Sequence, residues 1–138
     1  MIYDELVSEC ENHNIYLSYE DLDDKINGFF VHDQNGSVIV LSNRIKNNPP
    51  LRNVVLAEEL GHYHTLPLNN TPCKYWSRLD RANFDKYEAK AIRWAALRLI
   101  SQDDIRAAVQ DGLAERFCVT QGMMYLRLQL PDVKIVRE

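Results

Sequence analysis

The sequence has little cysteine, no long apolar run and no excess of positive charge, and each shortage excludes a class of protein. Its three cysteines, Cys10, Cys73 and Cys118, are far apart and form no C-x-x-C pair. An odd count of this kind argues against a disulfide framework or a cysteine zinc finger and is typical of a reducing compartment. No apolar run approaches the ~20 residues that span a bilayer, and the acidic, amphipathic N-terminus is unlike a signal peptide. We therefore predict a soluble, cytoplasmic protein.

The charge and length of the chain narrow its class further. Sixteen Lys and Arg against 20 Asp and Glu give a net charge of −4, so no direct nucleic-acid partner is expected. The 138 residues suffice for one modest hydrophobic core. Because the sequence contains no internal repeat, low-complexity tract or linker, we predict a single domain over residues 1–138, with 102–138 as its helical C-terminal extension.

Apolar spacing predicts an α+β fold in which a small antiparallel sheet packs with four to five helices. Ile2, Leu6 and Cys10 recur at helical spacing, which indicates an opening helix over residues 2–13. Two β-rich runs, 28–32 and 37–42, flank Asn35-Gly36. This dipeptide is a strong hairpin signal because both residues tolerate positive φ.

The other helices are predicted from the residues that begin and end them. Ser101 and Thr120 are expected to cap two of them, and LPLNNTPC forms a loop after the first. In the second, apolar residues recur at steps of three and four. The predicted segments are 51–65, 80–100, 102 to Asp111-Gly112, and 121 to Pro131.

The most specific signal lies in VVLAEELGHYHT, residues 54–65. From Glu58 it reads as the zinc-protease pattern His-Glu-x-x-His with glutamate in place of the first histidine. On a helix, Glu58 and His62 lie about 6 Å apart along the axis, so both side chains could hold one ion. Glu59 is turned about 100° away and could approach a metal-bound water instead. Gly61 has no side chain and would admit another element close to this helix.

The glutamate substitution affects which metal is expected. A carboxylate oxygen is an accepted zinc ligand, but its charge weakens the Lewis acidity of zinc and favours harder ions such as manganese. Glu88, 26 residues after His62, is the candidate third ligand, because the intervening loop is long enough to fold its helix back antiparallel. His64 is a possible fourth ligand, although it points away from the other two. His13 and His32 lack a ligand-spaced partner and are interpreted as ordinary polar residues.

A surface explanation competes with the metal site. E-x-x-H alone is a weak pattern and favours solvated carboxylates at Glu58 and Glu59, with His62 satisfied in the core. Glu88 alone is more typical of a surface residue. The combination favours the metal site, because the pattern lies in a long apolar helix that a carboxylate-bearing helix follows.

Four segments of the chain resemble the ImmA/IrrE family of small metallopeptidases, which are common in phages and mobile elements. The segments are GFFVHDQNGSVIVLSNRI, LAEELGHYHT, YEAKAIRWAALRLI and LAERFCVTQGMMYLRLQL, and the likeness covers roughly residues 1–130. It implies a zincin-like domain with a two-helix metal site after a β-hairpin, binding zinc or another divalent ion. Glu58, His62 and Glu88 would be the ligands and Glu59 the general base.

The resemblance also implies a function. The protein would be a zinc-dependent peptidase that cleaves or otherwise inactivates a helix-turn-helix repressor of a phage or mobile element, in the cytoplasm of a bacterial host. Tyr63, Tyr87 and His64 are candidates for stabilising the oxyanion. One alternative is a non-catalytic, metal-stabilised module that binds the repressor without cutting it. Another is direct DNA binding through residues 102–130, which their acidic residues oppose.

Overall fold

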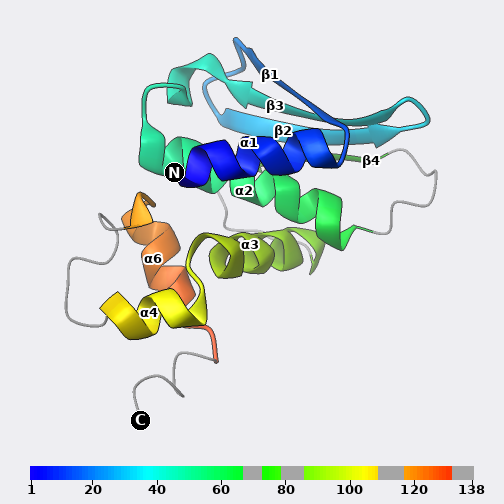
Figure 1. The fold of residues 1–138 in the computed structure, drawn as a ribbon. Coiled ribbons are helices and arrows are strands. Elements are labelled where there is room, and N and C mark those ends of the chain that lie inside the picture. Colours follow the sequence, from blue (N-terminus) through cyan, green and yellow to red (C-terminus); the bar gives the residue numbers. More distant parts are fainter. Residues whose placement is uncertain (67–72, 79–85, 109–116, 132–138) are drawn as a thin grey trace.

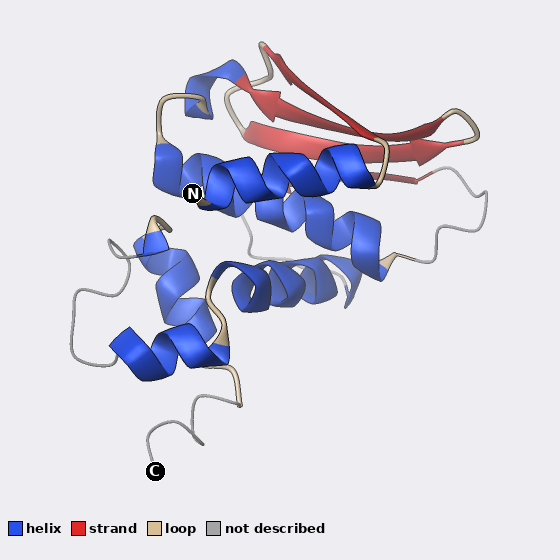
Figure 2. Cartoon of the chain, viewed as in Figure 1, coloured by secondary structure: helices blue, strands red, loops and turns tan. Residues whose placement is uncertain are grey.

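A four-stranded sheet lies over layers of helices in the computed structural model, which describes residues 1–66, 73–78, 86–108 and 117–131 (Figures 1 and 2). The helices are α1 (Ile2–Asn12), α2 (Pro49–Thr65), α3 (Lys86–Leu99), α4 (Gln102–Ala108) and α6 (Gln121–Leu128), with a 3-10 helix η1 (Asn43–Ile45). The strands are β1 (Ile15–Glu20), β2 (Ile26–Asp33), β3 (Gly36–Ser42) and β4 (Cys73–Arg78). The predicted α+β fold class is confirmed.

The hairpin between β2 and β3 is present as predicted. The strands pair antiparallel up to Asp33 and Gly36. Of the Asn35-Gly36 pair, only Gly36 has a positive φ, at 121°. Asn35 instead donates its backbone N–H to the carboxylate of Asp33 at 2.7 Å, which is the local bond by which aspartate favours turns.

The sheet is larger than the predicted hairpin, because two further strands join it. The order is β1-β3-β2-β4, with β1 parallel to β3 and β4 antiparallel to β2. Asn14, with a φ of 57°, turns the chain from α1 into β1. Both added strands have six residues, and so short a strand is held by its neighbours in the sheet rather than by its own propensity.

The helices follow the predictions within the described residues. Pro49 and Pro50 open α2, and Asn48 caps it by accepting the backbone N–H of Leu51, as proline at the first turn favours. Ser101 and Thr120 cap α4 and α6, each accepting a backbone N–H at 3.1 Å. Three predicted features lie partly or wholly outside the described part of the chain. They are most of the loop at 66–73, the first residues of the helix at 80–100 and the helix end at Asp111-Gly112.

One cluster of buried apolar side chains joins the layers. It takes residues from α1, the sheet, α2, α3 and α6, including Leu6, Phe30, Leu60, Ala95 and Met123. α2 lies between the sheet and α3, and α3 runs antiparallel to it (Figure 1). None of the helices in the described residues is long and apolar enough to cross a membrane. The central position of α2 matters most, because this helix carries the E-E-x-x-H pattern.

Cys10 is one of the core residues and gives a first prediction. Its side chain is 1% exposed, and burial, with a smaller effect of the carboxylates of Glu9 and Glu11, raises the pKa of its thiol from 9.0 to about 12. We expect no alkylation of Cys10 by iodoacetamide in the folded chain at pH 8, because the thiolate is the reactive form. Peptide mapping after alkylation, with and without urea, measures this; labelling of Cys10 without urea at the rate seen in urea would contradict it.

The same shift sets the sign of a pH dependence. Cys10 releases its proton near pH 9 in the unfolded chain and only near 12 in the folded chain. The unfolded state is therefore favoured increasingly as the pH rises from about 9 to 12. Cys10→Ala removes this contribution, so the free energy of unfolding of that variant should fall less steeply over the same range.

Candidate metal centre

The E-E-x-x-H pattern lies on a part of α2 that is buried on every side. All residues from 53 to 62 are buried; Glu58, Glu59 and His62 are 3%, 0% and 4% exposed. Carboxylates are almost never buried to this extent unless they are paired, hydrogen-bonded or bound to a metal. The explanation that Glu58 and Glu59 are surface charges is therefore excluded.

Two close contacts define how α2 is rotated between its neighbours. A Cβ built on Gly28 of β2 would lie 3.0 Å from Cγ1 of Val55, so Val55 faces the sheet. A Cβ built on Gly61 would overlap the carbonyl oxygen of Ala91 and lie 2.9 Å from its Cα, so Gly61 faces α3. The expectation that Gly61 admits another element is confirmed, and that element is α3.

Glu58 and His62 lie between these two directions. Glu58 is three residues from both Val55 and Gly61, and at about 100° per residue this places it about 60° from each direction. The imidazole of His62 stacks on Phe30 of β2, with ring centroids 6.4 Å apart and planes at 19°. Glu59 is turned further towards the sheet. The pattern therefore occupies the side of α2 between α3 and β2.

Helical geometry places Glu88 on the same side of the contact between α2 and α3. His64 and Trp94, each three residues after the contact points Gly61 and Ala91, stack with centroids 4.7 Å apart. Residues three positions before a contact point project about 120° from those three positions after it. Glu58 precedes Gly61 by three positions, and Glu88 precedes Ala91 by three positions. Because the two helices run antiparallel, both carboxylates lie on the side of the helix pair opposite the His64–Trp94 stack. Glu88 is half-buried there.

The three predicted ligands are of chemical types that suit a divalent ion, although their side chains do not form a coordination sphere in the structure. Two carboxylates and an imidazole are accepted ligands of zinc and manganese. Among the residues that the structure describes, no three His, Cys, Asp or Glu side chains converge closely enough to hold an ion. The predicted ligands Glu58, His62 and Glu88 are therefore brought to one side of the helix pair, and their side chains would have to close on the ion.

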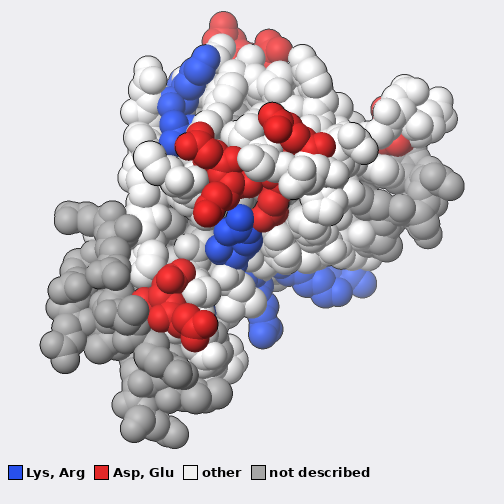
Figure 3. Space-filling view, viewed as in Figure 1, with Lys and Arg blue, Asp and Glu red and all other residues white. Residues whose placement is uncertain are grey.

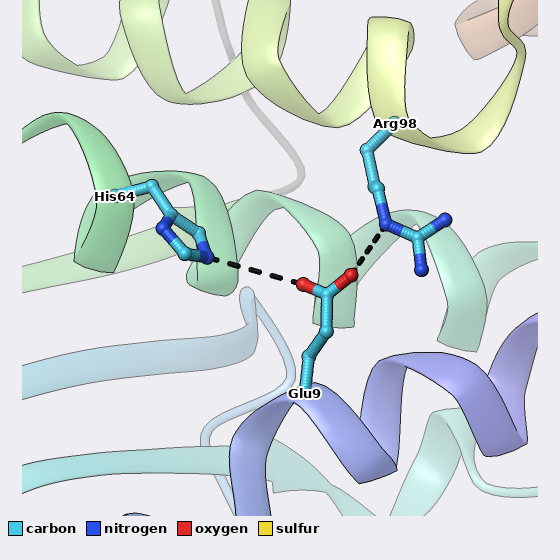
Figure 4. Close-up of polar contacts among 3 residues, drawn as sticks. All are labelled: Glu9, His64 and Arg98. Atoms are coloured by element: carbon cyan, nitrogen blue, oxygen red, sulfur yellow. Dashed lines mark hydrogen bonds and ion pairs between the residues drawn. The ribbon is translucent and has the colours of Figure 1, made fainter. Parts of the chain in front are cut away.

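His64 lies away from this group. Its ring centroid is 5.0 Å from that of His13, and its Nε2 is 3.9 Å from a carboxylate oxygen of Glu9 (Figure 4). Burial and the neighbouring His13 lower the pKa of His64, while Glu9 opposes them. The structure therefore gives His64 a place in a cluster with α1 and Trp94 rather than among the candidate ligands.

Some neighbours of the centre had no signal in the sequence. Phe30 of β2 lies nearly parallel to the His62 ring, and Tyr63 packs against both Phe30, at 6.4 Å, and His13, at 5.2 Å. Of the oxyanion candidates, Tyr63 and His64 belong to this aromatic cluster, and Tyr87 is half-buried next to Glu88 on α3. Phe30 could be expected in the core from its strand, but its contact with His62 depends on how α2 crosses the sheet.

A comparison with known families covers most of the chain. A family model described as Peptidase_M78, IrrE N-terminal-like domain, matches residues 10–129. The match includes all four residues of the predicted site, whereas most of α1 precedes it. No curated protein matches the chain.

Proposed function

The chain belongs to the Peptidase_M78 family of IrrE N-terminal-like domains, and we propose that it is a peptidase that holds a divalent ion with Glu58, His62 and Glu88 and uses Glu59 as its base. Membership of this family confirms the resemblance to the ImmA/IrrE metallopeptidases and supports a peptidase-like function. Zinc is the proposed ion, with manganese as the alternative that the carboxylate ligands favour.

The joint burial of Glu58, Glu59 and His62 carries this proposal. Burying two carboxylates within one helical turn is costly unless cations or hydrogen bonds compensate them. A bound divalent ion supplies such compensation. The placement of Glu88 on the same side of the helix pair as Glu58 supports its role as third ligand.

The chain's own residues would divide the work of peptide hydrolysis. When bound, the ion polarises the scissile carbonyl and acidifies water. The carboxylate of Glu59 accepts a proton from the attacking water and returns it to the amine as the C–N bond breaks. Phe30 restricts rotation of the His62 ring, and the absence of competing bulk water around Glu59 strengthens its electrostatic interactions.

The proposed substrate is a helix-turn-helix repressor of a phage or mobile element, encountered in the bacterial cytoplasm. This assignment is supported by the family resemblance alone. A second candidate function is a metal-stabilised module that binds such a repressor without cutting it. The complete burial of Glu59 favours this second candidate, because a base must come into contact with the substrate.

Metal content tests the ligand set. We expect about one zinc or manganese per chain in the wild-type protein and a loss of most of it in Glu58→Ala, His62→Ala and Glu88→Ala, because an open site of this kind rests on three protein ligands. Elemental mass spectrometry of the purified proteins measures it. His32→Ala, which removes an imidazole that pairs with Ser37 in the hairpin, is the control and should retain the ion. A wild-type chain that binds no zinc or manganese after loading would contradict the proposal.

A further inference from the structure

α3 is linked to α1 and α2 by a group of residues that we call the brace: Glu9, His64, Trp94 and Arg98. Figure 4 shows three of them, Glu9, His64 and Arg98. The carboxylate of Glu9 on α1 accepts a hydrogen bond from Nε of Arg98 at 2.5 Å. Its other oxygen lies 3.9 Å from Nε2 of His64. His64 in turn stacks on Trp94. One carboxylate of α1 thus contacts both helices that carry the candidate ligands.

The contact at Gly61 and Ala91 does not by itself determine how α3 is rotated. Three of the five buried side chains of α3 are alanines, and the other two are Ile92 and Leu99. The alanines Ala91, Ala95 and Ala96 offer few ridges to interlock with α2. Trp94 and Arg98 are larger side chains of α3 itself. Trp94 stacks on His64 of α2 and Arg98 donates a hydrogen bond to Glu9 of α1, so both belong to the brace. The brace is therefore in a position to set the rotation of α3 about its axis.

Rotation of α3 acts directly on Glu88. A side chain about 6 Å from the helix axis moves about 2 Å when the helix turns by about 20°. This displacement equals a whole zinc–oxygen bond, which is about 2.0–2.2 Å. A ligand on α3 therefore needs the rotation of the helix to be fixed, and the contacts that the brace makes with α1 and α2 are in a position to fix it.

We infer that Glu9 is a positioning residue, which sets the rotation of α3 through Arg98 and so places Glu88 for the ion. This inference rests on the proposed function. Glu9 lies on α1, immediately before the segment that matches the family model. Acidic side chains gather on the face that α1 occupies (Figure 3), and Glu9 of α1 forms an ion pair with Arg98 of α3.

Charge reversal across the Glu9–Arg98 pair tests this role. We expect Glu9→Arg and Arg98→Glu each to weaken Zn²⁺ binding about tenfold, the lower end of the effect of residues that orient ligands. The double variant restores the pair in reverse and should bind within about threefold of wild type. Titration calorimetry with Zn²⁺ at pH 7.5 gives the dissociation constants. Glu11→Arg, an equal charge change at an exposed position of α1, is the control and should bind as wild type does.

A second readout separates this inference from the proposed function. Hydrogen exchange of the α3 amides in the metal-free chains should be faster in both single variants and return to the wild-type rate in the double variant. The role of Glu9 is overturned, while the proposed function stands, if Zn²⁺ binding is unchanged in the single variants. The same holds if Zn²⁺ binding is not restored in the double variant. A wild-type chain that binds no Zn²⁺ overturns both, whatever the exchange rates. Glu9→Gln, a milder change, replaces Glu9→Arg if that variant does not fold.

Discussion

Gly61→Ala is expected to destabilise the chain by about 3 kcal/mol, because overpacking a helix contact costs about 1–3 kcal/mol and more where backbone is struck. The added Cβ would overlap the carbonyl oxygen of Ala91 and lie 2.9 Å from both its carbonyl carbon and its Cα. These are backbone atoms on the buried side of α3, so no side chain can rotate to relieve the overlap. The gain in helix propensity from Gly to Ala, about 1 kcal/mol, offsets only part of the cost.

The measurement is urea unfolding at 25 °C, with Gly122→Ala as the matched control. A Cβ at Gly122 would meet only the hydroxyl of Thr120, at 4.0 Å. The same substitution on α6 should therefore leave the free energy of unfolding unchanged or raise it by up to about 1 kcal/mol. Equal stabilities of the two variants would contradict the close approach of α2 and α3, and with it the placement of Glu88 on the same side of the helix pair as Glu58.

Gly61→Ala should also reduce metal binding in the chain that remains folded. Moving α3 outward by even about 1 Å separates Glu88 from the ligands on α2 by half a metal–oxygen bond. Metal content per folded chain is therefore expected to fall together with stability, whereas Gly122→Ala should leave it unchanged.

Glu59→Gln is expected to lower the rate of peptide hydrolysis by about 10²–10⁴-fold, the contribution typical of a general base. The amide keeps the shape of the side chain but has a negligible affinity for a proton at neutral pH. Metal content should stay within about twofold of wild type, because Glu59 is not one of the proposed ligands.

Hydrolysis can be followed without knowing the natural substrate, by mass spectrometry of the new amino termini that the metal-loaded protein creates in a peptide library. Glu5→Gln, an exposed position on α1, is the control for the loss of one carboxylate and should cleave as wild type does. Equal cleavage by wild type and Glu59→Gln would show that Glu59 is not the base. A wild-type chain that retains its ion and cleaves nothing would favour the metal-stabilised binding module.

The complete burial of Glu59 has a consequence for both functions. A substrate peptide can contact this carboxylate only after some movement of the surrounding chain, since the side chain has no exposed surface. Such an opening costs free energy before any bond is broken. It lowers the rate of hydrolysis, because only the open fraction of the chains can react. A binding module requires no such opening, which is why Glu59→Gln separates the two.

The local features of the fold could be predicted from the sequence. The caps at Ser101 and Thr120, the hairpin before Gly36 and the helix over 51–65 depend on contacts within about four residues. Such contacts form in the same way wherever the segment lies in the fold. The separation of Glu58 and His62 by one helical turn is of the same kind, so a candidate pair of ligands could be recognised without coordinates.

Contacts between distant segments required the tertiary structure. The parallel pairing of β1 with β3 was not predicted, because strands of six residues depend on the sheet that they join. The burial of Glu59 follows from the enclosure of α2 between sheet and α3, which its mixed polar and apolar sequence does not reveal. The link from Glu9 to Arg98 spans 89 positions in the chain.

Glu88 shows where the two kinds of information meet. The sequence by itself determined that a carboxylate follows the E-E-x-x-H helix on a second helix, at a distance that permits an antiparallel return. Only the tertiary structure decided on which side of α2 that carboxylate lies, because the rotation of α3 depends on the approach of Ala91 to Gly61 and on the stack of Trp94 on His64. Periodicity defines the faces of each helix, but packing against a neighbour decides which faces meet.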